Sequence, residues 1–313
     1  MTRLRRTRLR REVVEEVSLE DLFGPYPSDI LEIDPKMVAI MDEEVKPLIE
    51  AMEGGHYKMQ EVRPGHYLHV SDLISKCVRK RAIGHRLNTQ GAARRLTMTD
   101  LVTFAQGDAI HDLIKQQTAL ASPHKTWGKW SCKCGYLFHD EPCTLADTDP
   151  DEICDYCGTP TNTYHEVSMR DEELWIVGNP DLLLWLEEHD AFHITELKSI
   201  AGDQFQELVR PKPEHVLQVL FYWFLMYRQG YRLTSRVSIA YINKAWRMQD
   251  PRKEFTLDPI SELGRLRDYI EDAKAYRAAL EDPEAPLPVR TLCSSRASKD
   301  AKNCEFCNIC FEL

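Results

Sequence analysis

Two carboxylates and a lysine stand at the ends of two short apolar runs near the middle of the chain. Asp181 precedes the first run, and Glu196 and Lys198 close the second. Alternate residues of a strand point to the same face, so Glu196 and Lys198 should project together, and a hairpin would bring Asp181 beside them. Two carboxylates about 4 Å apart repel by roughly 4 kcal/mol at an effective dielectric constant near 20. The sequence therefore predicts a divalent cation between them.

A cation at this place could polarise a phosphate, and the lysine could hold or deprotonate a metal-bound water, as in metal-dependent phosphodiesterases. Two helical features would complete the site. His111 follows Gly107 by one helical turn, and a neutral imidazole is a good ligand for Mn²⁺. Gln218 and Tyr222 share one face of an apolar helix, where they could hydrogen-bond a DNA strand or groups near the metal.

The order of these features resembles that in the RecB-like branch of the PD-(D/E)xK nuclease superfamily. Each motif alone is common, but a GxxxH helix, a strand ending at Asp181 of Pro180-Asp181, a Glu-x-Lys strand and a QxxxY helix in succession are fairly specific. The resemblance covers about residues 67–313 apart from an insertion. It implies a restriction-endonuclease-like α/β fold, with a mixed central sheet flanked by helices.

The resemblance also implies roles for individual residues. The catalytic Mg²⁺ or Mn²⁺ would have four ligands, namely His111, Asp181, Glu196 and the backbone carbonyl of Leu197. Lys198 would position the attacking water, and Gln218 and Tyr222 would form the family's QxxxY motif. Glu166 is a further candidate carboxylate near the site. In-line attack would leave a 5′-phosphate and a 3′-hydroxyl.

Nine of the ten cysteines fall into two groups, and Cys77 stands apart from both. Close cysteine pairs in a large chain without an export signal favour metal ligands over disulfides. In the first group, two short knuckles about twenty residues apart, each ending in a glycine, are typical of a structural zinc ribbon. The expected zinc ligands are Cys132, Cys134, Cys154 and Cys157. The first knuckle is unusually tight, so Cys143 or His139 could replace one ligand.

The second group lies near the C-terminal end, and its density of thiolates suits zinc or an iron–sulfur cluster. Together with Cys77 it resembles the pattern of iron–sulfur nucleases in the RecB-like branch, including the AddB nuclease domain and the CRISPR spacer-acquisition nuclease. The resemblance implies a 4Fe–4S cluster that staples the tail to the first helix. Its ligands would be Cys77, Cys293, Cys304 and Cys310, with Cys307 as the alternative to Cys293. A zinc site made of the four terminal cysteines alone is the competing interpretation.

The formal net charge of −10 counts against a nucleic-acid binder, although a local basic groove is sufficient for binding. Basic stretches at residues 3–11 and 76–86 could provide one, or could simply be solvated helix faces. No apolar run is long enough to span a membrane, and the arginine-rich start is not followed by an apolar segment. A secretory signal is therefore not expected, and the expected location is the cytoplasm.

We expect five regions along the chain. They are an N-terminal extension (1–66), a helical part of the nuclease domain (67–121), a zinc-ribbon insertion (122–163), the nuclease core (164–250), and a helical return with the iron–sulfur tail (251–313). Helices are predicted over 35–52, 71–87 with Ser71 as N-cap, 99–120, 213–228 and 260–280. Strands are predicted over 164–170, 174–177, 182–187, 192–197 and 235–242.

These features favour a Mg²⁺- or Mn²⁺-dependent exonuclease that acts on DNA, single-stranded or with free ends, in recombination, repair or replication. A stand-alone protein of this kind would suit a phage. No phosphate-binding helicase motif is present, so a helicase or recombination partner would supply unwinding. Two alternatives are a CRISPR-adaptation nuclease subunit and a non-catalytic DNA-binding or scaffold module. The presence of Asp181, Glu196 and Lys198 disfavours the second.

Overall fold

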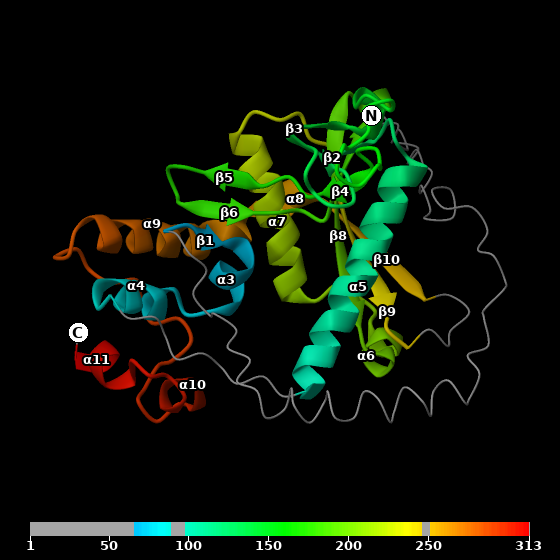
Figure 1. Cartoon of the computed structure of the whole chain (residues 1–313). Coiled ribbons are helices and arrows are strands. Elements are labelled where there is room, and N and C mark those ends of the chain that lie inside the picture. Colours follow the sequence, from blue (N-terminus) through cyan, green and yellow to red (C-terminus); the bar gives the residue numbers. More distant parts are fainter. Residues whose placement is uncertain (1–65, 89–97, 246–250, 313) are drawn as a thin grey trace, which may run out of the picture.

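A seven-stranded mixed sheet forms the centre of the computed structural model, which describes residues 66–88, 98–245 and 251–312 (Figure 1). The order is β10-β9-β8-β7-β2-β3, with β4 paired to β2, and only β8 and β9 run parallel. The bounds are β2 (Thr126–Ser131), β3 (Phe138–Thr144), β4 (Thr163–His165), β7 (Leu182–Leu186), β8 (Ala191–Ile200), β9 (Val237–Asn243) and β10 (Arg252–Leu257). The helix expected over 35–52 lies outside the described residues.

Two long helices cover the sheet, α5 (Met98–Ala121) and α7 (Pro213–Arg228), as expected from their sequences. The larger cluster of buried side chains joins α7 to Ile194 of β8. A smaller cluster joins Ala119 of α5 to Leu197 of β8. Residues 194 and 197 of one strand point to opposite faces, so α5 and α7 lie on opposite sides of the sheet. The expected mixed sheet flanked by helices is therefore confirmed.

A second sheet of three strands lies against α7, in the order β1 (Leu68–His69), β6 (Ile176–Gly178) and β5 (Met169–Asp171). A Cβ at Gly178 would lie 2.7 Å from Tyr222 Cε1, so only glycine allows β6 to approach α7 this closely. The single strand expected over 164–170 is wrong, because β4 and β5 belong to different sheets. Between them, Val167 enters the larger core and Glu166 contacts α5.

The helix expected over 71–87 is also wrong, because it divides into α3 (Val70–Ser75) and α4 (Val78–Arg86). Lys76 and Cys77 have extended backbone, and Cys77 Sγ accepts a hydrogen bond from the Lys80 N–H at 3.4 Å. Cys77 therefore caps α4. The N-cap position of α3 belongs to His69 and not to Ser71.

The C-terminal part contains a strand that the sequence pattern missed. β10 pairs with β9 and begins with charged residues, as edge strands often do. The helix expected over 260–280 is interrupted, since a 3-10 helix, η3 (Leu263–Leu266), separates α8 (Pro259–Glu262) from α9 (Arg267–Glu281). The remaining helices are η1 (Leu145–Asp147), η2 (Glu187–His189), α6 (Gly202–Glu207), α10 (Lys299–Lys302) and α11 (Cys307–Glu312). In the described part of the chain, no helix combines the length and apolarity needed to cross a membrane.

The cysteine-rich segment expected as an insertion shares the central sheet. Its first strand, β2, pairs with β7 through Thr126 opposite Leu184 and Trp127 opposite Leu183. The Trp130 side chain of β2 is fully buried and its Nε1 donates to the carbonyl of Cys143. The ribbon is thus anchored to the same sheet that carries the acidic residues.

Candidate active site and cysteine clusters

The hairpin of β7 and β8 positions the first carboxylate. Leu182, the first residue of β7, pairs with Thr195 of β8, and Asp181 immediately precedes it. The Oδ2 atom of Asp181 accepts a hydrogen bond from the backbone N–H of Leu197 at 2.7 Å. The expected hairpin therefore forms and brings Asp181 beside β8.

Glu196 and Lys198 project from one face of β8, as alternate strand residues do. Lys198 Nζ lies 2.5 Å from Glu196 Oε1. Glu196 is only 1% exposed, and its Oε2 has no hydrogen-bond partner among the described residues. A buried, ionised oxygen without a partner is strongly unfavourable, so this atom needs a proton or a cation.

His111 of α5 approaches Asp181. Its Nδ1 atom lies 3.8 Å from Oδ1 of Asp181, which is beyond hydrogen-bond distance. A Cβ at Gly107, one turn earlier, would lie 3.3 Å from Oγ of Ser199, so α5 passes close to β8 here. The His111 imidazole consequently lies beside the carboxylate of Asp181.

The two carboxylates have opposite pKa shifts. Burial alone would raise the pKa of Asp181, but the nearby imidazole of His111, the charge of Lys198 and the Leu197 N–H lower it below its ordinary value. Burial, followed by the charge of Asp181, raises the pKa of Glu196 to about 8. The charges of Glu196 and Asp181 outweigh burial and raise the pKa of Lys198. Burial beside Asp181 therefore favours a proton on Glu196 at neutral pH, whereas Asp181 favours its ionised form.

These donors fit a divalent cation. The unpartnered Oε2 of Glu196 is a free, buried oxygen ligand, and Asp181 beside it is ionised. Oxygen ligands suit Mg²⁺ and Mn²⁺, and the His111 imidazole adds a nitrogen that suits Mn²⁺. The N–H of Leu197 contacts Asp181, whereas the role of its carbonyl stays a prediction.

The two QxxxY residues contact each other on α7. Gln218 Nε2 donates to the hydroxyl of Tyr222 at 2.7 Å. Burial and then the charge of Glu196 raise the pKa of Tyr222 well above its ordinary value. Tyr222 therefore faces the same buried site as Glu196, and its contact with DNA stays a prediction.

Lys115 is a charged residue of this region that sequence reasoning missed. Its Nζ lies 2.6 Å from Glu166 Oε1 and 3.2 Å from Asp112 Oδ1. Burial raises the pKa of Glu166, Lys115 offsets part of this, and the charge of Asp181 raises it further. The spacing in the sequence could have indicated this residue, because Lys115 lies four residues after His111 and hence on the same helix face.

The ribbon cysteines form a compact group that could hold a metal ion. The sulfur atoms of Cys132, Cys134, Cys154 and Cys157 all lie within 4.8 Å of one another. Gly135 and Gly158 adopt φ values of +75° and +65°, which let both knuckles close. The backbone N–H groups of Leu137 and Tyr156 donate to sulfur atoms of this group, an arrangement that stabilises thiolate ligands.

The two expected substitute ligands lie outside this group. Neither Cys143 nor His139 belongs to the set of four, and His139 Nε2 instead contacts Glu152 Oε2 at 2.8 Å. The tight first knuckle therefore needs no replacement ligand.

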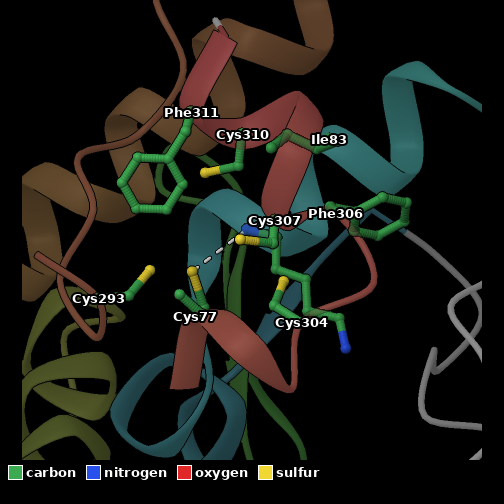
Figure 2. A pocket seen from close by; sticks show the side chains of 10 residues that line it. Cys77, Ile83, Cys293, Cys304, Phe306, Cys307, Cys310 and Phe311 are labelled. Atoms are coloured by element: carbon green, nitrogen blue, oxygen red, sulfur yellow. Dashed lines mark hydrogen bonds between the residues drawn. The ribbon is translucent and has the colours of Figure 1, made fainter. Parts of the chain in front are cut away.

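The five remaining cysteines line one pocket (Figure 2). They are Cys77, Cys293, Cys304, Cys307 and Cys310. Within the described ranges, no three of their sulfurs lie as close together as the ribbon sulfurs do. A cluster attaches each thiolate to a different iron, so it needs wider sulfur spacing than a single zinc ion. The absence of a compact sulfur group among the described residues of this pocket is therefore compatible with a cluster.

Residues of α4 and its N-cap lie against the cysteine pocket. Burial raises the pKa of Cys77, the Lys80 N–H offsets part of this, and Cys293, Cys304 and Cys310 raise it further. These are the three partners of Cys77 in the favoured cluster assignment. Arg79 of α4 donates from Nε to the sulfur of Cys310 at 3.2 Å.

Comparisons with known proteins give weak likenesses. The chain matches no protein-family model and no curated protein. It is similar to the crystal structure of SSO0001 at 14% identity and a TM-score of 0.33, over 87% of this chain and 96% of that one. It is also similar to an alkaline exonuclease from Laribacter hongkongensis at 11% identity and a TM-score of 0.36, over 69% of this chain and 88% of that one. Likenesses at this level carry no argument about function.

Replacement of Cys154 by serine should remove the ribbon metal. The variant loses one of four ligands, so its zinc content should fall from about one ion per chain to near zero. Elemental analysis of the purified proteins measures this content. Cys143→Ser is the matched control and should keep its zinc, because Cys143 lies outside the group. Equal zinc content in both variants would refute the ligand set.

The Mn²⁺ affinity of the acidic site should rise with pH up to about 8. Below the raised pKa of Glu196, about 8, a cation must displace a proton from this carboxyl. Each pH unit below that value should weaken the apparent affinity by up to about tenfold. Calorimetric titration between pH about 6 and 9 tests this. Glu196→Gln should bind more weakly without this pH dependence, and a flat wild-type profile would contradict the expectation.

Proposed function

We propose that this protein is a Mg²⁺- or Mn²⁺-dependent deoxyribonuclease that degrades single-stranded DNA from free ends. The observation that carries the proposal is the buried, unpartnered Oε2 of Glu196, next to Asp181 and on the same strand face as Lys198. A site that only stabilised the fold would have paired this oxygen or replaced it with an apolar group. The substrate class and the preference for ends rest on the family resemblance.

Each residue has a distinct task in the proposed reaction. Asp181, Glu196 and His111 would hold the cation. When bound, the cation supplies Lewis-acid activation of the phosphate and of water. Lys198 is charged, because its pKa is raised by Glu196 and Asp181, so its ammonium can donate hydrogen bonds to the attacking water and to phosphate oxygens. Gln218 and Tyr222 would restrain the strand or the carboxylates from the α7 side.

Replacement of Lys198 by alanine should abolish measurable cleavage, with a fall of at least about 100-fold in the cleavage rate. DNA binding should stay largely intact. The assay is incubation of the pure protein with end-labelled single- and double-stranded DNA and Mn²⁺ or Mg²⁺. Fluorescence anisotropy measures binding by the same variant. The products should carry 5′-phosphates and 3′-hydroxyls.

Lys274→Ala is a matched control, because this lysine lies on the exposed surface of α9 and pairs only with Glu271 in the described contacts. It should cleave like the wild type. Full cleavage by Lys198→Ala would remove Lys198 from the reaction. Absence of cleavage by the wild type with either metal would refute the proposed function.

The tail cysteines are proposed to bind a 4Fe–4S cluster with a structural role. Protein purified without oxygen should be brown and contain about four irons and four sulfides per chain. Cys77→Ser should lose the iron and the visible absorption, whereas Cys307→Ser should keep both if Cys293 is the fourth ligand. A colourless preparation with a second zinc in place of iron would overturn this assignment.

A further inference from the structure

A second histidine, His215, lies beside the candidate active site. It belongs to α7 and shares a helix face with Gln218 and Tyr222, which follow it by three and seven residues. Two residues of the central sheet, Lys198 and Tyr241, are register partners in the parallel pair of β8 and β9. Paired residues of adjacent strands point to the same face, so Tyr241 projects next to Lys198.

A chain of hydrogen bonds fixes the orientation of this imidazole. The backbone N–H of Lys212 donates to the hydroxyl oxygen of Tyr241 at 2.9 Å, and His215 Nδ1 lies 2.7 Å from the same oxygen. A backbone N–H can only donate, so the tyrosine oxygen accepts there and its own hydrogen can point to Nδ1. In that arrangement Nδ1 accepts the hydrogen bond, and the imidazole hydrogen lies on Nε2.

Burial and two nearby positive charges favour the neutral form of His215. Burial, then the charges of Lys198 and Lys212, lower its pKa to about 3. These two lysines would attract an anion to the region, and the neutral imidazole offers it an N–H donor. A phosphodiester at the proposed site carries such acceptor oxygens close to Lys198.

We propose that His215 donates a hydrogen bond from Nε2 to a phosphate oxygen of the DNA strand held beside Lys198. Tyr241 is a positioning residue, because it acts through His215 by holding the Nε2–H tautomer. The inference rests on the proposed nuclease function and deepens it, since it assigns a backbone-binding residue outside the motifs that the sequence revealed.

Two isosteric variants separate this role from a structural one. The amide nitrogen of glutamine can take the place of Nε2, whereas the amide of asparagine takes that of Nδ1. If His215 contacts the substrate, His215→Asn should raise the KM for a single-stranded oligonucleotide about tenfold or more relative to His215→Gln, with a smaller change in kcat. If His215 only supports Tyr241, the order of the two variants should reverse, and the proposal would be overturned.

The tautomer can be measured without any cleavage assay. Nitrogen-15 NMR of histidine-labelled protein, with His215→Gln used for assignment, should show the hydrogen on Nε2. A hydrogen on Nδ1 would overturn the proposal. Tyr241→Phe keeps the ring in its buried place but removes the hydroxyl, so it should mix the two tautomers and raise the KM.

The nuclease function and the role of His215 can be tested separately. If the wild type cleaves DNA but both His215 variants keep the wild-type KM, the role of His215 is wrong and the nuclease proposal survives. If the wild type cleaves nothing, the nuclease proposal is wrong, and the substrate contact of His215 falls with it. The expected result is wild-type cleavage, a high KM for His215→Asn, and a KM near that of the wild type for His215→Gln.

Discussion

The burial of Glu196 next to Asp181 is the constraint on which the rest of this structure depends. Two carboxylates in a water-poor interior repel each other, and Lys198 neutralises only one of their charges. Burial beside Asp181 raises the pKa of Glu196 to about 8, which favours a proton on this carboxyl at neutral pH. A divalent cation would relieve the repulsion with both groups ionised. In the proposed nuclease, this cation would lie where the phosphate is attacked.

The surrounding elements keep this unfavourable arrangement from relaxing. The Leu197 N–H holds Asp181 against β8, and α7 closes the other side with Tyr222. Gly178 lets β6 pack directly against the ring of that tyrosine. Close packing of these elements restrains the two carboxylates from moving apart, so their repulsion persists.

Local patterns made the centre of the site predictable. Glu196 and Lys198 contact each other because alternate residues of a strand share a face, and Asp181 joins them through a short hairpin. α5 and α7 were also predictable, since their lengths follow from long segments of helical character. The break at Cys77 was not, because a thiol is an unusual cap and residues 71–87 otherwise have a helical pattern. The pair of Lys115 and Glu166, and that of His215 and Tyr241, depend on contacts between distant segments, which no local pattern encodes.

The pairing of β2 with β7 links the ribbon to the behaviour of the whole molecule. β7 now lies inside the central sheet, with β8 on one side and β2 on the other. If loss of the ribbon metal loosened β2, the apolar strand β7 would become an open edge with unpaired backbone groups. Such an edge can recruit a strand from another chain. A metal held by the four ribbon thiolates would thus protect the protein from self-association.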